Sequence, residues 1–268
     1  VVQILQYVAN DESLKMFVVW TMGSLGDVTF NQLAVLIPSI IAGLLLAVIT
    51  IKPLNLLLFG INFNAYFLIL IRKFRQAWES EEVRAYLLII AAATLAITFN
   101  VRGYFSSFAQ AFQQTIFQVA SIITTTGYAT TNFDLWPEFS RTILVLLMFV
   151  GACAGSTGGG IKVSRILILL KTVKKELIQL LHPRSVRRIQ IDGKAIEHEV
   201  VRSTNVYMGV YIFIFAFSML LIALNNFDLI TNFSAVAATL NNIGPGLSLV
   251  GPSGNFSMFS DFSKLVLI

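Results

Sequence analysis

The sequence predicts an all-α, polytopic membrane protein that contains two repeats of one order of helices and loops. Three observations carry this prediction. Of the 268 residues, 56% are hydrophobic and only 12% are charged, which is about half of the charge that a water-soluble domain needs. The apolar residues gather in runs long enough to cross a bilayer, and the basic residues gather between these runs.

Several apolar runs are candidates for membrane spans, each of which needs roughly 20 mostly apolar residues. The run 141–171 is too long for one plain span and contains a cluster of glycines. The last run is cut off by the end of the chain. The other candidates, together with this last one, are 32–51, 54–71 (interrupted by polar residues and Gly60), 86–101, 200–224 and 262–268.

Two further segments, 105–120 and 232–240, have helical character but are too short or too polar to cross a bilayer. Each ends in an irregular stretch of small residues, TTTGY at 124–128 and NNIGPG at 241–246. A polar loop and another apolar helix follow each stretch. The order of spanning helix, short helix, irregular loop and spanning helix therefore occurs twice, across 86–171 and 200–268, as an internal repeat.

The basic residues predict the orientation in the membrane, because cytoplasmic loops are enriched in Lys and Arg. The stretch 171–188 and the run Arg72–Arg75 are basic and should be cytoplasmic. The stretches 128–139 and 247–261 carry Asp134, Glu138 and Asp261 but no Lys or Arg, so both irregular loops should open to the outside. A multi-pass protein of the bacterial inner membrane is expected. The basic residues of the first stretch are Lys171, Lys174, Lys175, Arg184, Arg187 and Arg188.

The two irregular loops have the composition of a cation site. Irregular backbone inside a bilayer must be buried in protein or line a wet cavity, where its carbonyls can replace the hydration shell of a cation. The absence of Asp and Glu from both loops favours a monovalent ion over a divalent one. Taken alone, each loop could also be a surface turn. The candidate ligands are Thr124, Thr125, Thr126, Gly127 and Tyr128 in the first loop, and Asn241, Asn242, Ile243, Gly244 and Gly246 in the second.

The sequence GACAGSTGGGIKVSR at 151–165 is the third notable element. Its five glycines oppose a rigid helix, since each costs about 1 kcal/mol relative to Ala. A helix break below the irregular loops would form a movable constriction. The spacing of a nucleotide P-loop is missing, and Lys162 could snorkel to the membrane edge or pair with a carbonyl. The candidate gating residues are Gly151, Gly155, Ser156, Thr157, Gly158, Gly159, Gly160 and Lys162.

The sequence does not predict an enzyme. His182 and His198 flank the basic stretch, and neither stands at a telling distance from a carboxylate or a nucleophile. The single cysteine, Cys153, excludes a disulfide framework and a cysteine-based metal cluster. The clusters of Lys and Arg between apolar runs are typical of cytoplasmic loops and not of nucleic-acid binding.

Residues 60–268 resemble the membrane subunit of the Trk/Ktr/HKT-type potassium transporters, near the TrkH branch. The resemblance implies four helix–pore-loop–helix repeats around one axis, of which 85–175 would be the third and 199–268 the fourth, truncated in its last helix. It makes the two irregular loops selectivity-filter segments, with K+ bound at the carbonyls of Thr125, Thr126, Asn242 and Ile243. The matching pieces are GINFNAYF at 60–67, TTTGYATTNFDLWP at 124–137, GACAGSTGGGIKVSR at 151–165 and NNIGPGL at 241–247.

The same resemblance implies partners. It makes the glycine-rich stretch an intramembrane gating loop, and it implies a homodimer on a cytoplasmic, nucleotide-binding regulatory subunit of the TrkA type. The basic loop 176–198 could face that subunit. Nucleotide would act only through this partner, K+ would be the transported ion, and no covalent cofactor is expected.

Residues 1–60 resemble instead the permease of iron-siderophore and cobalamin ABC importers, through YVANDESLKMFVVWTMGSL at 7–25 and KPLNLLLFG at 52–60. This predicts a join of two partial genes near 59–61, with 61–84 as the end of a transmembrane helix and a cytoplasmic loop. Two alternative functions follow. The chain could be an importer permease, or a fragment that is inactive because it carries two of four filter segments.

Overall fold

A computed structural model of the chain describes residues 53–183 and 188–268. The chain divides into two compact units, and the second, Ile51–Ile268, contains all of these residues. The helix predicted at 32–51 and most of the permease-like segment 1–60 lie outside the described residues, as do Arg184 and Arg187.

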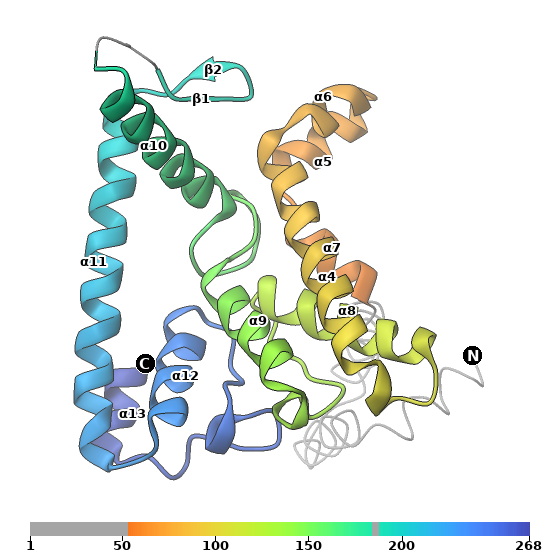
Figure 1. The fold of residues 1–268 in the computed structure, drawn as a ribbon, viewed down its shortest axis with the longest axis vertical. Coiled ribbons are helices and arrows are strands. Elements are labelled where there is room, and N and C mark those ends of the chain that lie inside the picture. The colour runs from red at the N-terminus through yellow and green to blue at the C-terminus, as the bar shows by residue number, and fades with distance from the viewer. Residues whose placement is uncertain (1–52, 184–187) are drawn as a thin grey trace, which may run out of the picture. The chain divides into compact units, whose positions relative to one another are not determined.

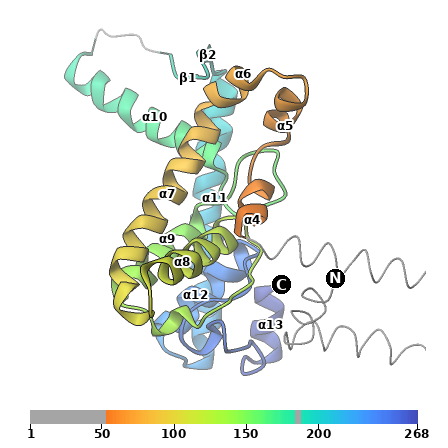
Figure 2. The ribbon, with the colours of Figure 1, turned by 90° about the vertical axis from the view of Figure 1, so that its right-hand side faces the viewer.

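Within the described residues the chain is mostly helical, as the composition predicts (Figures 1 and 2). A two-stranded antiparallel hairpin, β1–β2, connects α10 to α11. Single 3-10 turns lie at 102–104, 133–135, 223–225 and 248–250. The elements are α4 (Pro53–Phe59), α5 (Phe63–Leu70), α6 (Phe74–Glu79), α7 (Glu81–Val101), α8 (Phe108–Ile123), α9 (Glu138–Phe149), α10 (Val163–Leu181), β1 (Gln190–Ile191), β2 (Lys194–Ala195), α11 (His198–Ile222), α12 (Leu229–Leu240) and α13 (Asp261–Leu267).

Two of these helices are long and apolar enough to cross a membrane. They are α7 with its following turn, Glu81–Tyr104, and α11 with its following turn, His198–Asn225. Both coincide with predicted spans, although α7 begins five residues earlier than the apolar run because the charged residues before it are also helical. The helices α8 and α12 are short, as the repeat predicts.

The structure differs from the sequence prediction in two places. The run 54–71 forms two short helices, α4 and α5, which are separated at Gly60. Asn62 begins the second of them, because its side chain accepts a hydrogen bond from the backbone N–H of Asn64 at 2.6 Å. The basic stretch 171–188 was predicted as a loop, but α10 continues through Leu181, since apolar residues recur at the helical spacing of Leu170, Val173 and Leu177 alongside the lysines.

The core joins the two repeats. Helices α7, α8 and α9 pack against one another and α12 packs against both α9 and α11. Three rings fill the junction of α9, α11 and α12: Phe149 lies 5.4 Å from Phe215 and 5.9 Å from Phe233, centroid to centroid, and the latter two are 5.2 Å apart. Fully buried side chains around this junction include those of Tyr86, Ile97, Val101, Ile122, Phe133, Leu144 and Met148.

A side chain caps the N-terminus of each short helix. Ser107 accepts from the N–H of Gln110 at 3.2 Å at the start of α8. Asp228 accepts from the N–H of Thr231 at 3.0 Å and from its hydroxyl at 2.6 Å at the start of α12. These bonds satisfy backbone donors that a helix leaves free at its first turn.

The first prediction concerns Gly60. A Cβ atom there would lie 2.0 Å from the Tyr86 hydroxyl oxygen and 3.0 Å from Cγ2 of Thr124, and the Tyr86 hydroxyl already donates to the Leu57 carbonyl at 3.0 Å. We expect Gly60→Ala to lower the free energy of unfolding by about 1–3 kcal/mol through overpacking. Thermal denaturation of the purified protein in detergent measures this. Gly209→Ala is the control, since nothing lies within 4 Å of its new methyl group; equal melting temperatures for both variants would contradict the prediction.

The second prediction concerns the cap of α12. The hydroxyl of Thr231, followed by backbone N–H groups, lowers the pKa of Asp228 below its ordinary value. The charged form is therefore favoured in the folded state, so its contribution to stability is present above the unfolded pKa of about 3.9 and is lost as the pH falls through the lower, folded pKa. Asp228→Ala should lower the melting temperature at neutral pH.

This difference from the unmodified protein should shrink as the pH falls from about 4 toward the lower pKa of the folded state, below which the carboxylate is protonated in both states. A series of thermal denaturation curves from pH 7 to pH 3 measures the effect. Asp261→Ala is the control, because Asp261 is fully exposed and pairs only with Lys264. A difference that stays constant across the series would show that the charge of Asp228 does not contribute.

Candidate ion-permeation site

The first irregular loop, Thr124–Tyr128, begins where α8 ends in a Schellman motif. The N–H of Thr125 donates to the Ile122 carbonyl at 3.0 Å, and the N–H of Thr126 donates to the Ser121 carbonyl at 2.9 Å. Thr125 has a φ of 55°, which a β-branched residue rarely adopts. Gly127 follows with a φ of 78°. The chain therefore leaves the helix sharply at Thr125.

The second loop, Asn241–Gly246, repeats this geometry at the end of α12. The N–H of Asn242 donates to the Thr239 carbonyl at 3.0 Å, and the N–H of Ile243 donates to the Ala238 carbonyl at 2.7 Å. Asn242 has a φ of 56°, and Gly244 has a φ of 105°. TTTG at 124–127 and NNIG at 241–244 thus share the same helix ending and a positive φ at their second and fourth residues, despite different side chains.

This termination leaves carbonyl groups free. Among the residues that the structure describes, the carbonyl oxygens of 124–127 and 241–244 accept no hydrogen bond from the protein. A carbonyl in a membrane needs a partner, and a desolvated cation is one that fits a cluster of neutral oxygens. The C-terminal ends of α8 and α12, where partial negative charge accumulates, lie directly before these carbonyls.

The two loops are in contact. A Cβ atom on Gly127 would lie 1.9 Å from the Ile243 carbonyl oxygen and 3.3 Å from Cδ of Pro245. Only a residue without a side chain can occupy this position while both loops keep their places. The chain therefore brings together the two stretches that the sequence analysis selected, although they lie in different repeats.

Two of the ten predicted ligands are engaged in other contacts. The Tyr128 carbonyl accepts from the Ser121 hydroxyl at 2.6 Å, and the Tyr128 side chain is 57% exposed. The N–H of Gly246 donates to the Val250 carbonyl at 2.7 Å, and a Cβ at Gly246 would lie 2.9 Å from Oγ of Ser234. The Tyr128 carbonyl thus already has a donor within the protein, whereas the contacts of Gly246 involve its N–H and its Cα.

The glycine-rich loop between α9 and α10 packs against both irregular loops. The N–H of Gly159 donates to Oγ1 of Thr125 at 2.7 Å. A Cβ on Gly159 would lie 2.7 Å from the Asn241 carbonyl oxygen, and one on Gly158 would lie 3.3 Å from the Thr124 carbonyl oxygen. The glycines are therefore needed because the loop backbone touches the ends of both short helices.

Backbone contacts shape the rest of the glycine-rich loop. The two ends of the loop are joined by a hydrogen bond from the N–H of Gly151 to the Ile161 carbonyl at 2.7 Å. Lys162 donates to the Gly158 carbonyl, so of the two alternatives for this lysine the structure has the carbonyl pair. Three of the remaining predicted residues bond to nearby backbone. The Gly155 carbonyl accepts from the N–H of Phe63 at 3.1 Å, the Ser156 hydroxyl donates to the Cys153 carbonyl at 2.6 Å, and the Thr157 hydroxyl donates to the Phe59 carbonyl at 3.3 Å. Gly160 lies beside a side chain, since a Cβ there would be 3.3 Å from Oδ1 of Asn241.

Helix α11 fixes the side chain of Asn241. The Tyr211 hydroxyl donates to Oδ1 of Asn241 at 3.0 Å, and Nδ2 of Asn241 donates to the Ala237 carbonyl at 2.8 Å. One helical turn earlier on α11, the ring of Tyr207 lies under the guanidinium of Arg165, whose Cζ is 4.0 Å from the ring centroid. A cavity of about 210 Å³ lies beside this group, lined by Gly160, Tyr207, Val210, Tyr211, Ile214, Leu240 and Asn241.

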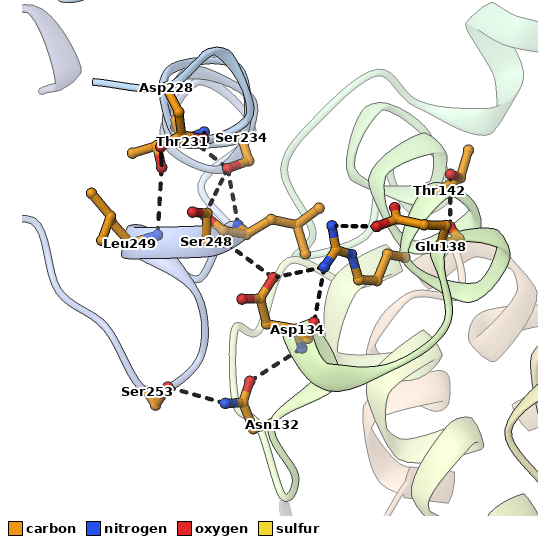
Figure 3. Close-up of polar contacts among 12 residues, drawn as sticks. Asn132, Asp134, Glu138, Thr142, Asp228, Thr231, Ser234, Ser248, Leu249 and Ser253 are labelled. Carbon is orange, nitrogen blue, oxygen red and sulfur yellow. Dashed lines mark hydrogen bonds and ion pairs between the residues drawn. The ribbon is translucent and has the colours of Figure 1, made fainter. Parts of the chain in front are cut away.

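A polar network that the sequence analysis did not anticipate joins the segments that follow the two loops (Figure 3). The carboxylate of Asp134 accepts from the N–H of Ser248 at 3.0 Å and pairs with Arg141 at 3.8 Å. Asn132 donates to the Ser253 hydroxyl at 3.2 Å. Ser248 has a φ of 58°, so this bond holds an unfavourable backbone conformation. The sequence analysis used only Asp134 of this network, as an acidic residue that indicates the orientation in the membrane.

Comparisons with known proteins identify the family of this chain. A family model described as TrkH, cation transport protein, matches residues 21–268. The Trk system potassium uptake protein TrkH of Escherichia coli (strain K12) is 35% identical over 224 residues, which cover 82% of this chain and 46% of that protein. The protein of the same name from Vibrio parahaemolyticus is 41% identical over 194 residues, which cover 71% of this chain and 39% of that protein.

A solved structure is also similar. The crystal structure of the potassium transporter TrkH from Vibrio parahaemolyticus aligns with a TM-score of 0.73 and 37% identity, covering 80% of this chain and 47% of that one. The chain therefore spans about half the length of the relatives it matches. The family match begins at residue 21, well inside the segment 1–60, and the comparisons do not support the resemblance of that segment to an importer permease. The chain belongs to the TrkH family of cation transport proteins.

Proposed function

We propose that this chain forms part of the pathway of a potassium uptake protein, in which carbonyls of the two irregular loops replace water around K+. The observation that carries the proposal is the contact between Gly127 and the Ile243 carbonyl, which joins two loops that leave their helices in the same way. In both loops the carbonyls of 124–127 and 241–244 accept no hydrogen bond from the described part of the chain. The ligands would be the carbonyls of Thr125, Thr126, Asn242 and Ile243. The relatives reported above are potassium uptake proteins by name.

Neutral oxygens suit a monovalent ion. A divalent cation requires carboxylates to offset its desolvation, and neither loop contains Asp or Glu.

The segments 85–175 and 199–268 would be the third and fourth of four pore repeats around one axis, in a multi-pass protein of the bacterial inner membrane. The short helices α8 and α12 would direct their negative ends toward the ion.

The glycine-rich loop is the proposed gate. It touches both irregular loops through Gly158 and Gly159, and a segment with five glycines can change conformation at little steric cost. Displacing it would open the path below the ion sites. The residues assigned to the gate in the sequence analysis, from Gly151 to Lys162, remain part of this proposal.

Partners follow from the same proposal. A second copy of the protein would form a homodimer, and a cytoplasmic nucleotide-binding subunit would face the segment 176–198. Along α11, exposed apolar side chains such as Phe213 and Leu220 support contact with lipid or with further helices. An importer permease is not favoured, because that alternative depended on the segment 1–60 alone.

The third prediction tests the ion sites. In a full-length pore that carries this chain, Gly127→Ser and Gly244→Ser should each lower the ratio of potassium to sodium flux, by about tenfold for a loss of about 1.4 kcal/mol. Gly127→Ser should have the larger effect, because its side chain meets the Ile243 carbonyl, whereas at Gly244 only the φ of 105° opposes a side chain. Fluxes into proteoliposomes measure both ions.

The control is Gly103→Ser, since nothing lies within 4 Å of a Cβ at that position. Unchanged potassium and sodium fluxes in both loop variants would refute the assignment of the loops. A parallel measurement on the chain alone, beside the full-length pore, tests whether two loops suffice for conduction.

A further inference from the structure

A buried carboxylate on α7 has no part in the function proposed so far. Glu82 is only 6% exposed and is the one charged residue among the buried side chains of the described part of the chain. Its Oε1 accepts from the N–H of Ala154 at 2.6 Å and from the N–H of Ser164 at 3.0 Å. A buried charge is costly unless it is bonded in this way.

The two donors belong to the two limbs of the glycine-rich loop. Ala154 lies on the limb that follows α9, and Ser164 lies in the first turn of α10. The first N–H groups of a helix have no partner within it, and the residue at the N-cap of α10, Lys162, makes no capping bond with its side chain. Glu82 therefore supplies from α7 both the missing cap and a negative charge at the positive end of α10.

The other contacts that hold the loop are weaker in kind. The other bonds from the loop to neighbouring elements join neutral groups, such as that from the N–H of Cys153 to the Gly60 carbonyl at 3.0 Å and that from the N–H of Gly159 to Oγ1 of Thr125 at 2.7 Å. The charged bond of Lys162 to the Gly158 carbonyl lies within the loop. Within the described residues, no other carboxylate accepts a hydrogen bond from the loop. Charge-assisted bonds are roughly twice as strong as neutral ones, so Glu82 contributes the strongest single attachment.

We propose that Glu82 is the positioning residue of the glycine-rich loop. Its carboxylate clamps both limbs to α7, and the clamp holds Gly158 and Gly159 against Thr125 and Asn241. The consequence for ion flow rests on the function proposed above, but the clamp itself does not. Without the negative charge, as in a glutamine that keeps only a neutral acceptor oxygen, the bonds to the two buried N–H groups weaken and the loop opens more often.

The chain offers a matched control in the preceding residue. Glu81 pairs with Lys171 in the middle of α10, and its N–H donates to Asp192 in the hairpin at 2.6 Å, so neither contact lies at the loop. Glu81→Gln and Glu82→Gln make the same chemical change one residue apart. Only the second should affect the loop.

The chain also carries its own probe, because its single cysteine, Cys153, lies in the loop and is fully buried. The fourth prediction concerns how fast maleimide labels Cys153 in the chain reconstituted into lipid nanodiscs. Glu82→Gln should accelerate labelling about tenfold, since local opening exposes the thiol. Glu81→Gln should leave the rate within about twofold of the unmodified chain.

An unchanged rate in Glu82→Gln, or an equal increase in Glu81→Gln, overturns the clamp. If Glu82→Gln does not fold, Glu82→Asp takes its place, because the shorter side chain keeps the charge but cannot reach both N–H groups. Slow labelling of a folded Glu82→Asp variant would equally refute the proposal.

A flux measurement in the full-length pore separates positioning from general damage. Glu82→Gln should raise potassium flux with an unchanged ratio of potassium to sodium, whereas a variant with a damaged fold conducts less. Faster labelling with no rise in flux overturns the link to conduction. Labelling needs no conduction, so fast labelling together with unaltered fluxes in Gly127→Ser and Gly244→Ser would sustain the clamp and refute the ion sites.

Discussion

The need of backbone polar groups for partners inside a membrane is the constraint on which this structure depends. Two short helices end within the protein, and the carbonyls beyond their ends accept no hydrogen bond in the part of the chain that the structure describes. In hydrocarbon such groups would cost several kcal/mol each. They become useful only if something else bonds to them, and the contact of Gly127 with Ile243 gathers them in one place.

The same constraint explains how unlike sequences form the same loop. A Schellman ending usually has glycine at its left-handed position, yet here that position holds Thr125 in one repeat and Asn242 in the other. Asparagine tolerates this conformation and threonine does not. At Thr125 a contact of the side chain offsets the strain, because Oγ1 accepts the N–H of Gly159 at 2.7 Å. The strained residue is thus also the one that holds the glycine-rich loop.

Much of this arrangement could be predicted from the sequence, because it depends on local properties. Apolar runs give the spans, and small residues after short helices give the two loops. The contacts of Glu82 and Asp134 could not be predicted, because they join residues 72 and 114 positions apart and no local pattern encodes such a pairing. The interruption at Gly60 was visible in the sequence, but the approach of the Tyr86 hydroxyl from another helix, which leaves no room for a side chain at Gly60, was not.

Two carboxylates hold the second irregular loop and the glycine-rich loop by the same kind of contact. On one side Asp134 accepts the N–H of Ser248, in the segment after the second loop; on the other Glu82 accepts N–H groups from both limbs of the glycine-rich loop. Each is a charged acceptor for backbone donors, which binds more strongly than a neutral one. Neither lies among the free carbonyls, where a negative charge would favour divalent ions. Charged side chains therefore hold the loops through the segments that flank them, and neutral oxygens alone remain at the proposed ion sites.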